Sequence, residues 1–132
     1  MISREEIRSI PERHRKLERE REQLDYLREK AVSLGALATD KERVQTSPDP
    51  DAMKFVDAAI DLEREIRADE TELIDLQKRA EMWIGTVYGK LPRKILRYKY
   101  INCYTWNQIG ELLGYSERYL QQIESDALSS LN

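Results

Sequence analysis

The stretch of residues 105–127, TWNQIGELLGYSERYLQQIESDA, constrains the fold more than any other part of the chain. Apolar residues recur there at helical spacing in two short runs, the first around Ile109 and the second around Leu120. Between the runs stands Gly114, the residue type that most readily takes the left-handed conformation ending a helix. Ser116 follows as a favoured N-cap for the next helix. Two short helices joined by such a turn form a helix-turn-helix, which is the structure the pattern predicts.

Composition favours long exposed helices over one large core, because 36% of the 132 residues are charged and only 8% are aromatic. The net charge is −3, so a nucleic-acid contact would need a local basic patch. With Cys103 as the only cysteine and His14 as the only histidine, we expect no internal disulfide, no metal site and no Cys–His nucleophile. No segment resembles a phosphate-cradling loop, so we expect neither an enzyme nor a cofactor.

The chain before residue 36 is rich in Glu, Arg, Lys and Leu, which are good helix formers. Ser3 with Glu6, and Ser9 with Glu12, have the spacing of a capping box. Because proline is tolerated only in a first turn, we expect the main helix to start near Pro11. Its charged run over residues 18–22 is interpreted as a solvated surface. Every seventh residue is apolar, as in Ile10, Leu17, Leu24 and Ala31.

Gly35 should end this helix, and residues 36–51 have the Thr, Asp, Ser and Pro content of a loop. The segment 51–88 then carries the clearest heptad pattern in the chain, with Asp69 alone breaking its apolar stripe. The two helices should fold back as an antiparallel coiled-coil hairpin, bringing Leu34 near Ala52 and Leu17 near Asp69. Asp69 would pair with a basic residue of the first helix, or tune the register or the oligomeric state.

Three helices should follow, over about 92–101, 105–113 and 117–131. Thr105 and Gln108 have capping-box spacing at the start of the second of these helices. Gly110 lies where the third helix must cross closely and a side chain would clash. The predicted fold is therefore all-α: residues 1–89 form a helical hairpin with a loop at about 36–51, and residues 90–132 form a three-helix helix-turn-helix domain.

In a helix-turn-helix the first turns of the last helix reach base edges in the major groove. The candidates for base reading are its outward residues Glu117, Arg118, Tyr119, Gln121 and Gln122. Phosphate contacts are expected from the basic stretch before the motif and from helix N-termini. The phosphate candidates are Arg93, Lys94, Arg97, Lys99, Tyr104, Thr105 and Ser116. A solvated helix face is the alternative interpretation of the basic stretch, and Tyr104 has a second interpretation as a packing residue.

The last 28 residues resemble region 4 of the sigma-70 type transcription initiation factors. The resemblance rests on an Ile-Gly pair before the turn, a Ser after it and a Gln-Ile-Glu…Ala-Leu…Leu ending; the matching residues are Thr105, Ile109, Gly110, Ser116, Gln122, Ile123, Glu124, Ala127, Leu128 and Leu131.

The whole chain resembles small phage and prophage proteins of the RinA-like and ArpU-like type, which carry a helical hairpin before a sigma-like domain. The shared features are Asp61-Leu62-Glu63, Leu96 with Lys99 and Tyr100, Trp106, and Gly114-Tyr115-Ser116. This resemblance implies a phage regulator of transcription, of the late-gene activator type, that acts on promoter DNA or on the host RNA polymerase in the bacterial cytoplasm.

Departures from region 4 concern the residues that read DNA. This chain has Glu117, Arg118, Tyr119 and Gln121 where region 4 has several arginines, and it keeps only Gln122. Residues 92–132 hold five basic and four acidic residues, a net charge of +1, so few counterions would be released on binding. We therefore expect a target site that differs from the usual promoter −35 element.

Three functions stay open at this point. The first is a regulator that binds double-stranded DNA, with a homodimer through the hairpin. The second is a protein-interaction module that docks on RNA polymerase without sequence-specific DNA binding. The third is a DNA-packaging adaptor similar to small terminase subunits. No apolar run approaches the roughly 18 residues that span a bilayer, so we expect no membrane partner.

Overall fold

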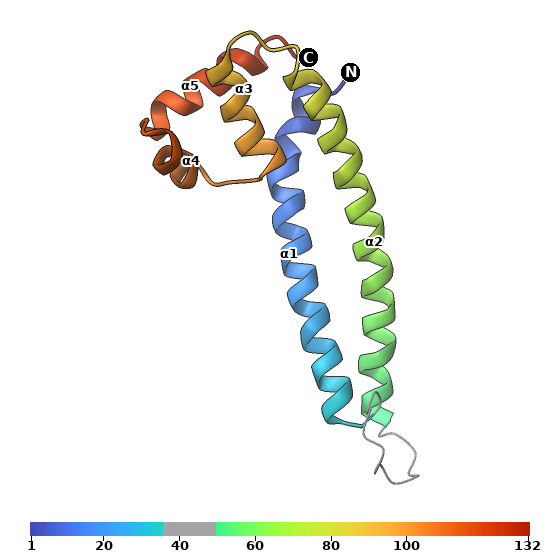
Figure 1. Ribbon diagram of the computed structural model, residues 1–132. Helices are drawn as coiled ribbons and strands as arrows, with labels where there is room; N and C mark the ends of the chain where they lie inside the picture. Colours follow the sequence, from blue (N-terminus) through green and yellow to red (C-terminus); the bar gives the residue numbers. More distant parts are fainter. Residues whose placement is uncertain (36–49) are drawn as a thin grey trace. The chain divides into compact units, whose positions relative to one another are not determined.

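A computed structural model of the chain describes residues 1–35 and 50–132 (Figure 1). These residues contain helices and no strand, which confirms the predicted all-α class. The helices are α1 (Arg4–Ser33), α2 (Pro50–Ile84), α3 (Lys90–Leu96), the π-helix η1 (Arg97–Ile101), α4 (Trp106–Leu113) and α5 (Glu117–Leu128). The predicted loop over 36–51 lies outside the described residues except for its last two positions, which begin α2.

Helix α1 begins at Arg4, so the expected start near Pro11 is wrong. The capping box at Ser3 is formed: its hydroxyl accepts from the Glu6 amide at 3.0 Å, and the Glu6 carboxylate accepts from the Ser3 amide at 3.0 Å. The Ser9 hydroxyl instead donates to the Glu6 carbonyl at 2.6 Å, inside the helix. Burial of Ile7 and Ile10 before the proline offsets the hydrogen bond that Pro11 cannot make.

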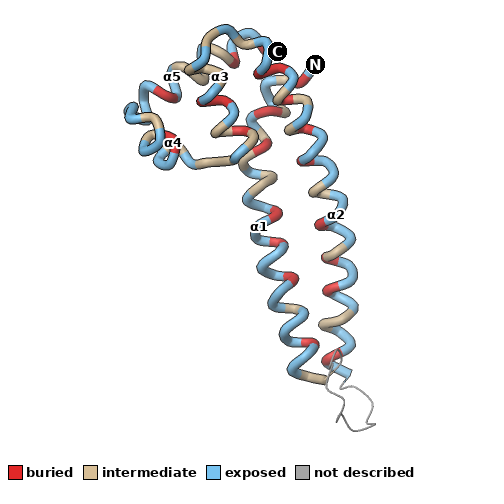
Figure 2. The backbone as a smooth tube through the Cα atoms, viewed as in Figure 1, coloured by how far each residue is buried: buried red, intermediate tan, exposed pale blue. Residues whose placement is uncertain are grey.

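Helices α1 and α2 pair in antiparallel fashion, as the heptads predict. Buried residues of each helix recur along one side, shown in red in Figure 2. The order of the ion pairs establishes the direction, because Lys16 Nζ meets Asp69 Oδ2 at 3.1 Å whereas Arg28 meets Glu63 at 2.6 Å. Asp69 thus pairs with a basic residue of the first helix, as one of the two interpretations of its position proposed. Gly35, with φ of 91°, follows the end of α1.

Glu20 contradicts the expectation that residues 18–22 form a solvated surface. Glu20 is 7% exposed, and its Oε1 atom has no hydrogen-bond partner among the described residues. Glu20 lies between Leu17 and Leu24 on the buried stripe of α1, so the seven-residue repeat continues through a carboxylate. The seven-residue repeat could be recognised in the sequence, but an acidic residue at position 20 gave no sign that this position is buried between the two helices.

Helix α2 ends at Ile84, four residues before the predicted end. A short connection follows, in which Gly89 has φ of 102° and Pro92 falls in the first turn of α3, where proline is tolerated. Helix α3 continues into η1, where the Asn102 amide donates to the Arg97 carbonyl at 3.0 Å and closes a wide turn. Ile95, Leu96 and Tyr100 face inward, as predicted.

The core of the helix-turn-helix is formed by Ile95, Ile109 and Leu120, which are all fully buried. Gly110 lets α4 approach the turn, because a Cβ atom there would lie 3.1 Å from the Tyr115 carbonyl oxygen and 4.0 Å from Leu120 Cδ1. The close approach predicted for this glycine is therefore present, and its nearest neighbour is the turn backbone.

Residue contacts divide the chain into two compact units, one of residues 1–14 with 71–132 and one of residues 15–70. In the first unit the two chain ends meet: the Arg4 amide donates to the Asn132 carbonyl at 2.9 Å, and its guanidinium donates to the Leu131 carbonyl at 2.8 Å (Figure 1). The predicted division into domains 1–89 and 90–132 stays a prediction. Among the described residues, no helix is both long and apolar enough to cross a membrane.

Candidate nucleic-acid interface

The turn between α4 and α5 has the capped geometry that the sequence predicts. Thr105 and Gln108 form a capping box: the Thr105 hydroxyl accepts from the Gln108 amide at 3.2 Å, and the Gln108 side chain accepts from the Thr105 amide at 2.9 Å. Gly114 ends α4 in the left-handed conformation, with φ of 76°. The Ser116 hydroxyl then accepts from the Tyr119 amide at 3.2 Å and starts α5. These contacts fix the helix-turn-helix geometry.

Helix α5 presents all five base-reading candidates to solvent while Leu120 is fully buried beneath them. Two of the candidates are joined along the helix, since Gln121 Nε2 donates to Glu117 Oε1 at 3.0 Å. Gln122 Nε2 donates to Asp126 Oδ1 at the same distance. Both hydrogen bonds are solvent-exposed, so either glutamine could donate to another acceptor instead at little cost in free energy. Arg118 makes no hydrogen bond or ion pair within the part of the chain that the structure describes.

The phosphate candidates of α3 and η1 are only partly available for a ligand. Arg93 Nη1 donates to the Val87 carbonyl at 2.8 Å. Arg97 Nε donates to Glu81 Oε1 at 2.8 Å, and both of these side chains are exposed. Lys94 is exposed, and neither an ion pair nor a hydrogen bond ties it to another described residue. The structure therefore brings these basic residues together but engages the two arginines with protein acceptors.

The phosphate candidates near the starts of α4 and α5 make packing or helix-capping contacts within the protein. Lys99 Nζ lies 4.6 Å from the centroid of the Trp106 ring, a distance suited to a cation–π contact. The Tyr104 ring packs against Tyr98, with 5.6 Å between the centroids, so its alternative interpretation as a packing residue is supported. The Thr105 and Ser116 hydroxyls each accept a backbone hydrogen bond, yet both residues are exposed.

Two polar side chains, the buried Tyr100 and the half-buried Gln77, hold η1 against its neighbours. The Tyr100 hydroxyl donates to Glu124 Oε2 at 2.7 Å, which links η1 to α5. Burial, together with the nearby Glu124 carboxylate, raises the pKa of Tyr100 far above its ordinary value. Gln77 of α2 donates to the Tyr100 carbonyl at 3.0 Å and to the Ile101 carbonyl at 3.1 Å, where η1 ends. Sequence reasoning missed Gln77, because nothing in a heptad marks a polar residue as a partner of a distant carbonyl.

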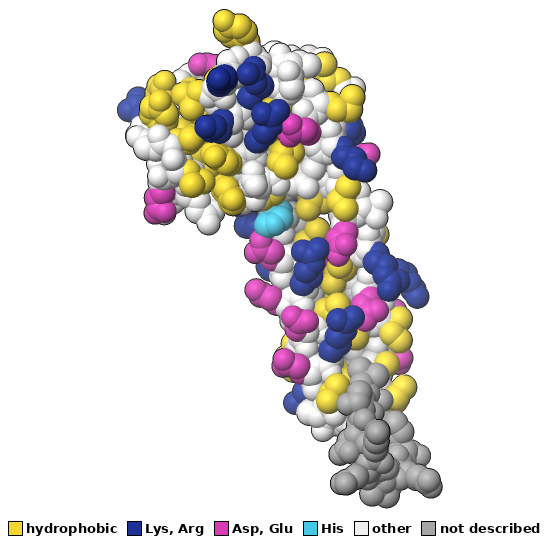
Figure 3. Space-filling view, in the orientation of Figure 1, with side chains coloured by type: hydrophobic (Ala, Val, Ile, Leu, Met, Phe, Trp, Pro, Cys, Tyr) yellow, Lys and Arg dark blue, Asp and Glu magenta, His cyan; other side chains and the backbone are white. Residues whose placement is uncertain are grey.

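A hollow of about 650 Å³ lies beside the basic residues of α3. Its lining combines positive charge with apolar and aromatic surface: Lys90, Leu91, Arg93, Lys94, Arg97, Tyr98, Asn102, Leu113 and Tyr115. Figure 3 shows Lys and Arg side chains gathered over this part of the molecule beside hydrophobic ones. Sequence reasoning assigned no site to Asn102 or Tyr115. The only available signal was the lack of acidic residues between Met82 and Gly110, which cannot show that a surface is concave.

Among the described residues, no group of three His, Cys, Asp or Glu side chains is placed to hold a metal ion. The arrangement offers hydrogen-bond donors, positive charge and aromatic rings, which suit binding. In comparisons with known proteins, no family model matches the chain, and neither a curated protein nor a solved structure matches it.

Proposed function

We propose that the chain is a DNA-binding regulator of phage gene expression that reads bases with the outward face of α5. One observation carries the proposal: all five predicted base-reading residues are exposed on α5, directly above the buried Leu120. An arginine can pair with guanine through two hydrogen bonds, and a glutamine can do so with adenine. Arg118 and Gln122 supply these two chemistries on the first two turns of the helix.

Phosphate contacts are proposed for the beginnings of α4 and α5. Thr105 and Ser116 are exposed at these two helix N-termini, where backbone amides and the helix dipole favour an anion. Lys99 and Tyr104 precede α4 and could add a charge and a hydroxyl group. The small net charge of the domain makes this a weak attraction, so specificity would depend mainly on base contacts.

The test is selection of binders from a random duplex pool by the full-length protein at near-physiological salt. We expect an enriched motif, and its symmetry would report whether one or two copies bind. Arg118→Ala and Gln122→Ala should each weaken binding to the selected site by about 1–3 kcal/mol and relax the preference at one base pair. Arg64→Ala, on the exposed surface of α2, is the matched control and should leave binding unchanged.

A second candidate function is docking on RNA polymerase without DNA recognition. It is favoured by apolar side chains that the helix-turn-helix leaves exposed, of which Leu112 is 57% exposed and Tyr119 is 47% exposed. Failure of a folded, helical protein to enrich any motif, together with binding to purified polymerase, would replace the first proposal with this one.

A further inference from the structure

The hollow beside α3 carries positive charge from four basic residues that line it, Lys90, Arg93, Lys94 and Arg97. Of its four basic residues, only Arg97 has an acidic partner among the described residues, Glu81. Arg93 donates to the neutral Val87 carbonyl, and no described acidic residue forms an ion pair with it. Lys90 and Lys94 are exposed, and neither forms an ion pair with any residue in the described ranges. The hollow therefore attracts an anionic group.

Apart from Asn102, the other residues that line the hollow are apolar or aromatic, and they are held in place. Leu91, Tyr98 and Leu113 pack against the buried core of the domain, so they cannot retreat when a ligand enters. Tyr115 stacks on Tyr119 with 5.0 Å between the ring centroids, and it remains 43% exposed. The hollow is thus preformed, and a preformed site loses little conformational entropy on binding.

The positive charge and the apolar walls of the hollow together favour an acidic peptide over a DNA backbone as its ligand. A DNA backbone presents charged phosphates and would leave the leucine and tyrosine surface of the hollow unused. It would also find few cations there, because only the side chains of Lys90 and Lys94 are without an acceptor among the described residues of the protein. A volume of about 650 Å³ lies in the usual range of ligand pockets, and apolar walls with a few polar groups are typical of such sites. The complementary ligand carries carboxylates around an aliphatic or aromatic side chain.

We propose that this hollow binds a short acidic segment of a partner protein, which inserts one aliphatic or aromatic anchor residue between Leu113 and Tyr115 and places its carboxylates against Lys90 and Lys94. Anchor residues in pockets carry most of the affinity in such interfaces, and charges at the rim contribute selectivity and speed of association. Tyr115 of the hollow packs against Tyr119 of the base-reading face. The inference rests on Lys90, Lys94 and the apolar walls of the hollow, so it does not depend on the proposed function.

The experiment is selection of a displayed library of random 16-residue peptides on the full-length protein, followed by fluorescence anisotropy with the enriched peptides. We expect enriched sequences to combine Asp or Glu with Leu, Phe or Trp. Their affinity should fall at least about tenfold for Lys90→Glu/Lys94→Glu, because like charges would then face each other. Lys90 begins α3, where an acidic residue is favourable, and Lys94 is exposed, so α3 should remain folded in this variant.

Two further variants make the result specific. Lys78→Glu, an exposed lysine of α2 outside the hollow, makes a single lysine-to-glutamate change and should leave peptide binding unchanged. Tyr115→Ala should weaken all enriched peptides that carry an aromatic anchor. Enrichment of peptides without acidic residues, equal binding by the Lys90→Glu/Lys94→Glu variant, or no enrichment at all would overturn the inference.

Loss of duplex DNA binding on Lys90→Glu/Lys94→Glu, with no acidic peptide enriched, would assign the hollow to the DNA backbone instead and overturn the inference. Failure of the proposed function is distinguishable, because it would appear as unchanged DNA binding by Arg118→Ala whatever the peptide result.

Discussion

The two compact units differ in the hydrogen bonding of their buried and half-buried polar side chains. In residues 1–14 and 71–132, the Tyr100 hydroxyl donates to Glu124, and Gln77 donates to the carbonyls that end η1. In residues 15–70, the Oε1 atom of the buried Glu20 has no hydrogen-bond partner in the part of the chain that the structure describes. A buried polar group that is fully paired helps to specify one structure, whereas an unpaired one carries its whole desolvation cost.

The hairpin of the second unit is held instead by its apolar seam and by exposed ion pairs such as Arg28–Glu63. Exposed pairs contribute little, so the seam supplies most of the stability there. Both tryptophans, Trp83 and Trp106, lie in the first unit. Tryptophan fluorescence therefore follows that unit alone during urea unfolding, and the helical circular dichroism follows both. Comparing the fluorescence and circular dichroism transitions therefore shows whether a substitution changes the stability of the first unit or of the second.

Tyr100→Phe should have the largest effect, a loss of about 1.5–3 kcal/mol in the free energy of unfolding, because a hydrogen bond to a charged group is removed. The loss should appear in the fluorescence transition. Tyr98→Phe is the matched control, since its hydroxyl makes no hydrogen bond to a described residue. Equal losses for both variants would show that the Tyr100–Glu124 bond does not distinguish the first unit.

Glu20→Leu should act in the opposite direction and stabilise the hairpin by about 1–3 kcal/mol at neutral pH, because it removes a buried carboxylate that lies beside the Asp69 carboxylate. The gain should appear in the circular dichroism transition. Glu22→Leu, at an exposed position of the same helix, is the control and should change stability by less than about 0.5 kcal/mol. A destabilised Glu20→Leu variant would show that the contacts of this carboxylate, including that with Asp69, stabilise the hairpin more than its burial costs.

The pH dependence gives a second check on Glu20. Burial, followed by the hydrogen bond and charge of Asp69, raises the pKa of Glu20 above its ordinary value of 4.5. Below pH 4.5 both the folded and the unfolded chain hold the proton, so the wild type suffers no charge penalty. As the pH rises through the higher pKa of the folded state, Glu20 ionises in its buried position and the folded wild type loses stability. The advantage of Glu20→Leu should therefore shrink as the pH falls toward 4.

Sequence patterns predicted the elements that depend on local chemistry. The capping box at Thr105, the left-handed Gly114 and the N-cap Ser116 each follow from the preference of one residue type for one backbone geometry. The antiparallel hairpin followed from two seven-residue repeats. The resemblance to region 4 and to phage regulators stays a prediction.

What the sequence did not predict depends on tertiary burial. Helix α1 passes through Pro11 because buried isoleucines on the preceding turns stabilise it. Glu20 is buried because the repeat places it in the seam, against its own preference for water. The hollow beside α3 needs residues from α3, η1, α4 and the segments that follow η1 and α4, and no local sequence pattern predicts such a concavity.

Gly114→Ala should have an intermediate effect and cost about 1–2 kcal/mol, because an L-residue is strained at φ of 76°. An added Cβ atom there would meet no atom within 4 Å, so the whole loss would come from the backbone. In Gly85→Ala the new Cβ would lie at an ordinary 3.5 Å from the Met82 carbonyl oxygen, outside the left-handed region. This control should be neutral in the fluorescence transition; a similar loss in both variants would refute the backbone explanation.

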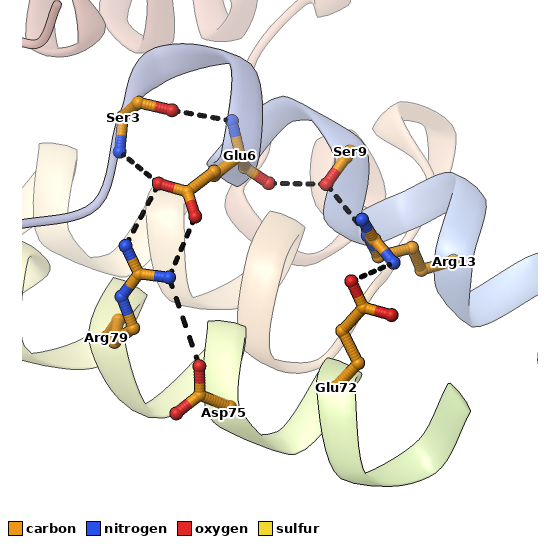
Figure 4. A network of polar contacts seen from close by, with 7 residues as sticks. All are labelled: Ser3, Glu6, Ser9, Arg13, Glu72, Asp75 and Arg79. Carbon is orange, nitrogen blue, oxygen red and sulfur yellow. Dashed lines mark hydrogen bonds and ion pairs between the residues drawn. The ribbon is translucent and has the colours of Figure 1, made fainter. Parts of the chain in front are cut away.

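Glu6→Gln should have the smallest effect at neutral pH and the clearest dependence on acid. Glu6 accepts from both terminal nitrogens of Arg79, at 2.8 and 2.9 Å, within the network of Figure 4. Its hydrogen bonds with Arg79, and then that with the Ser3 amide, lower the pKa of Glu6 from 4.5 to about 2. The stability from this group is therefore present above pH 4.5 and is lost as the pH falls toward 2.

Glutamine keeps the reach to the Ser3 amide but not the charge, so Glu6→Gln isolates the Arg79 pair. We expect its urea midpoint, followed by fluorescence, to lie below that of the wild type at pH 7 and to converge with it near pH 2. Glu5→Gln, at the exposed neighbouring position, should follow the wild type throughout. Parallel curves for the wild type and Glu6→Gln would mean that the paired carboxylate contributes nothing that acid can remove, and that directed polar contacts in the first unit matter only where they are buried.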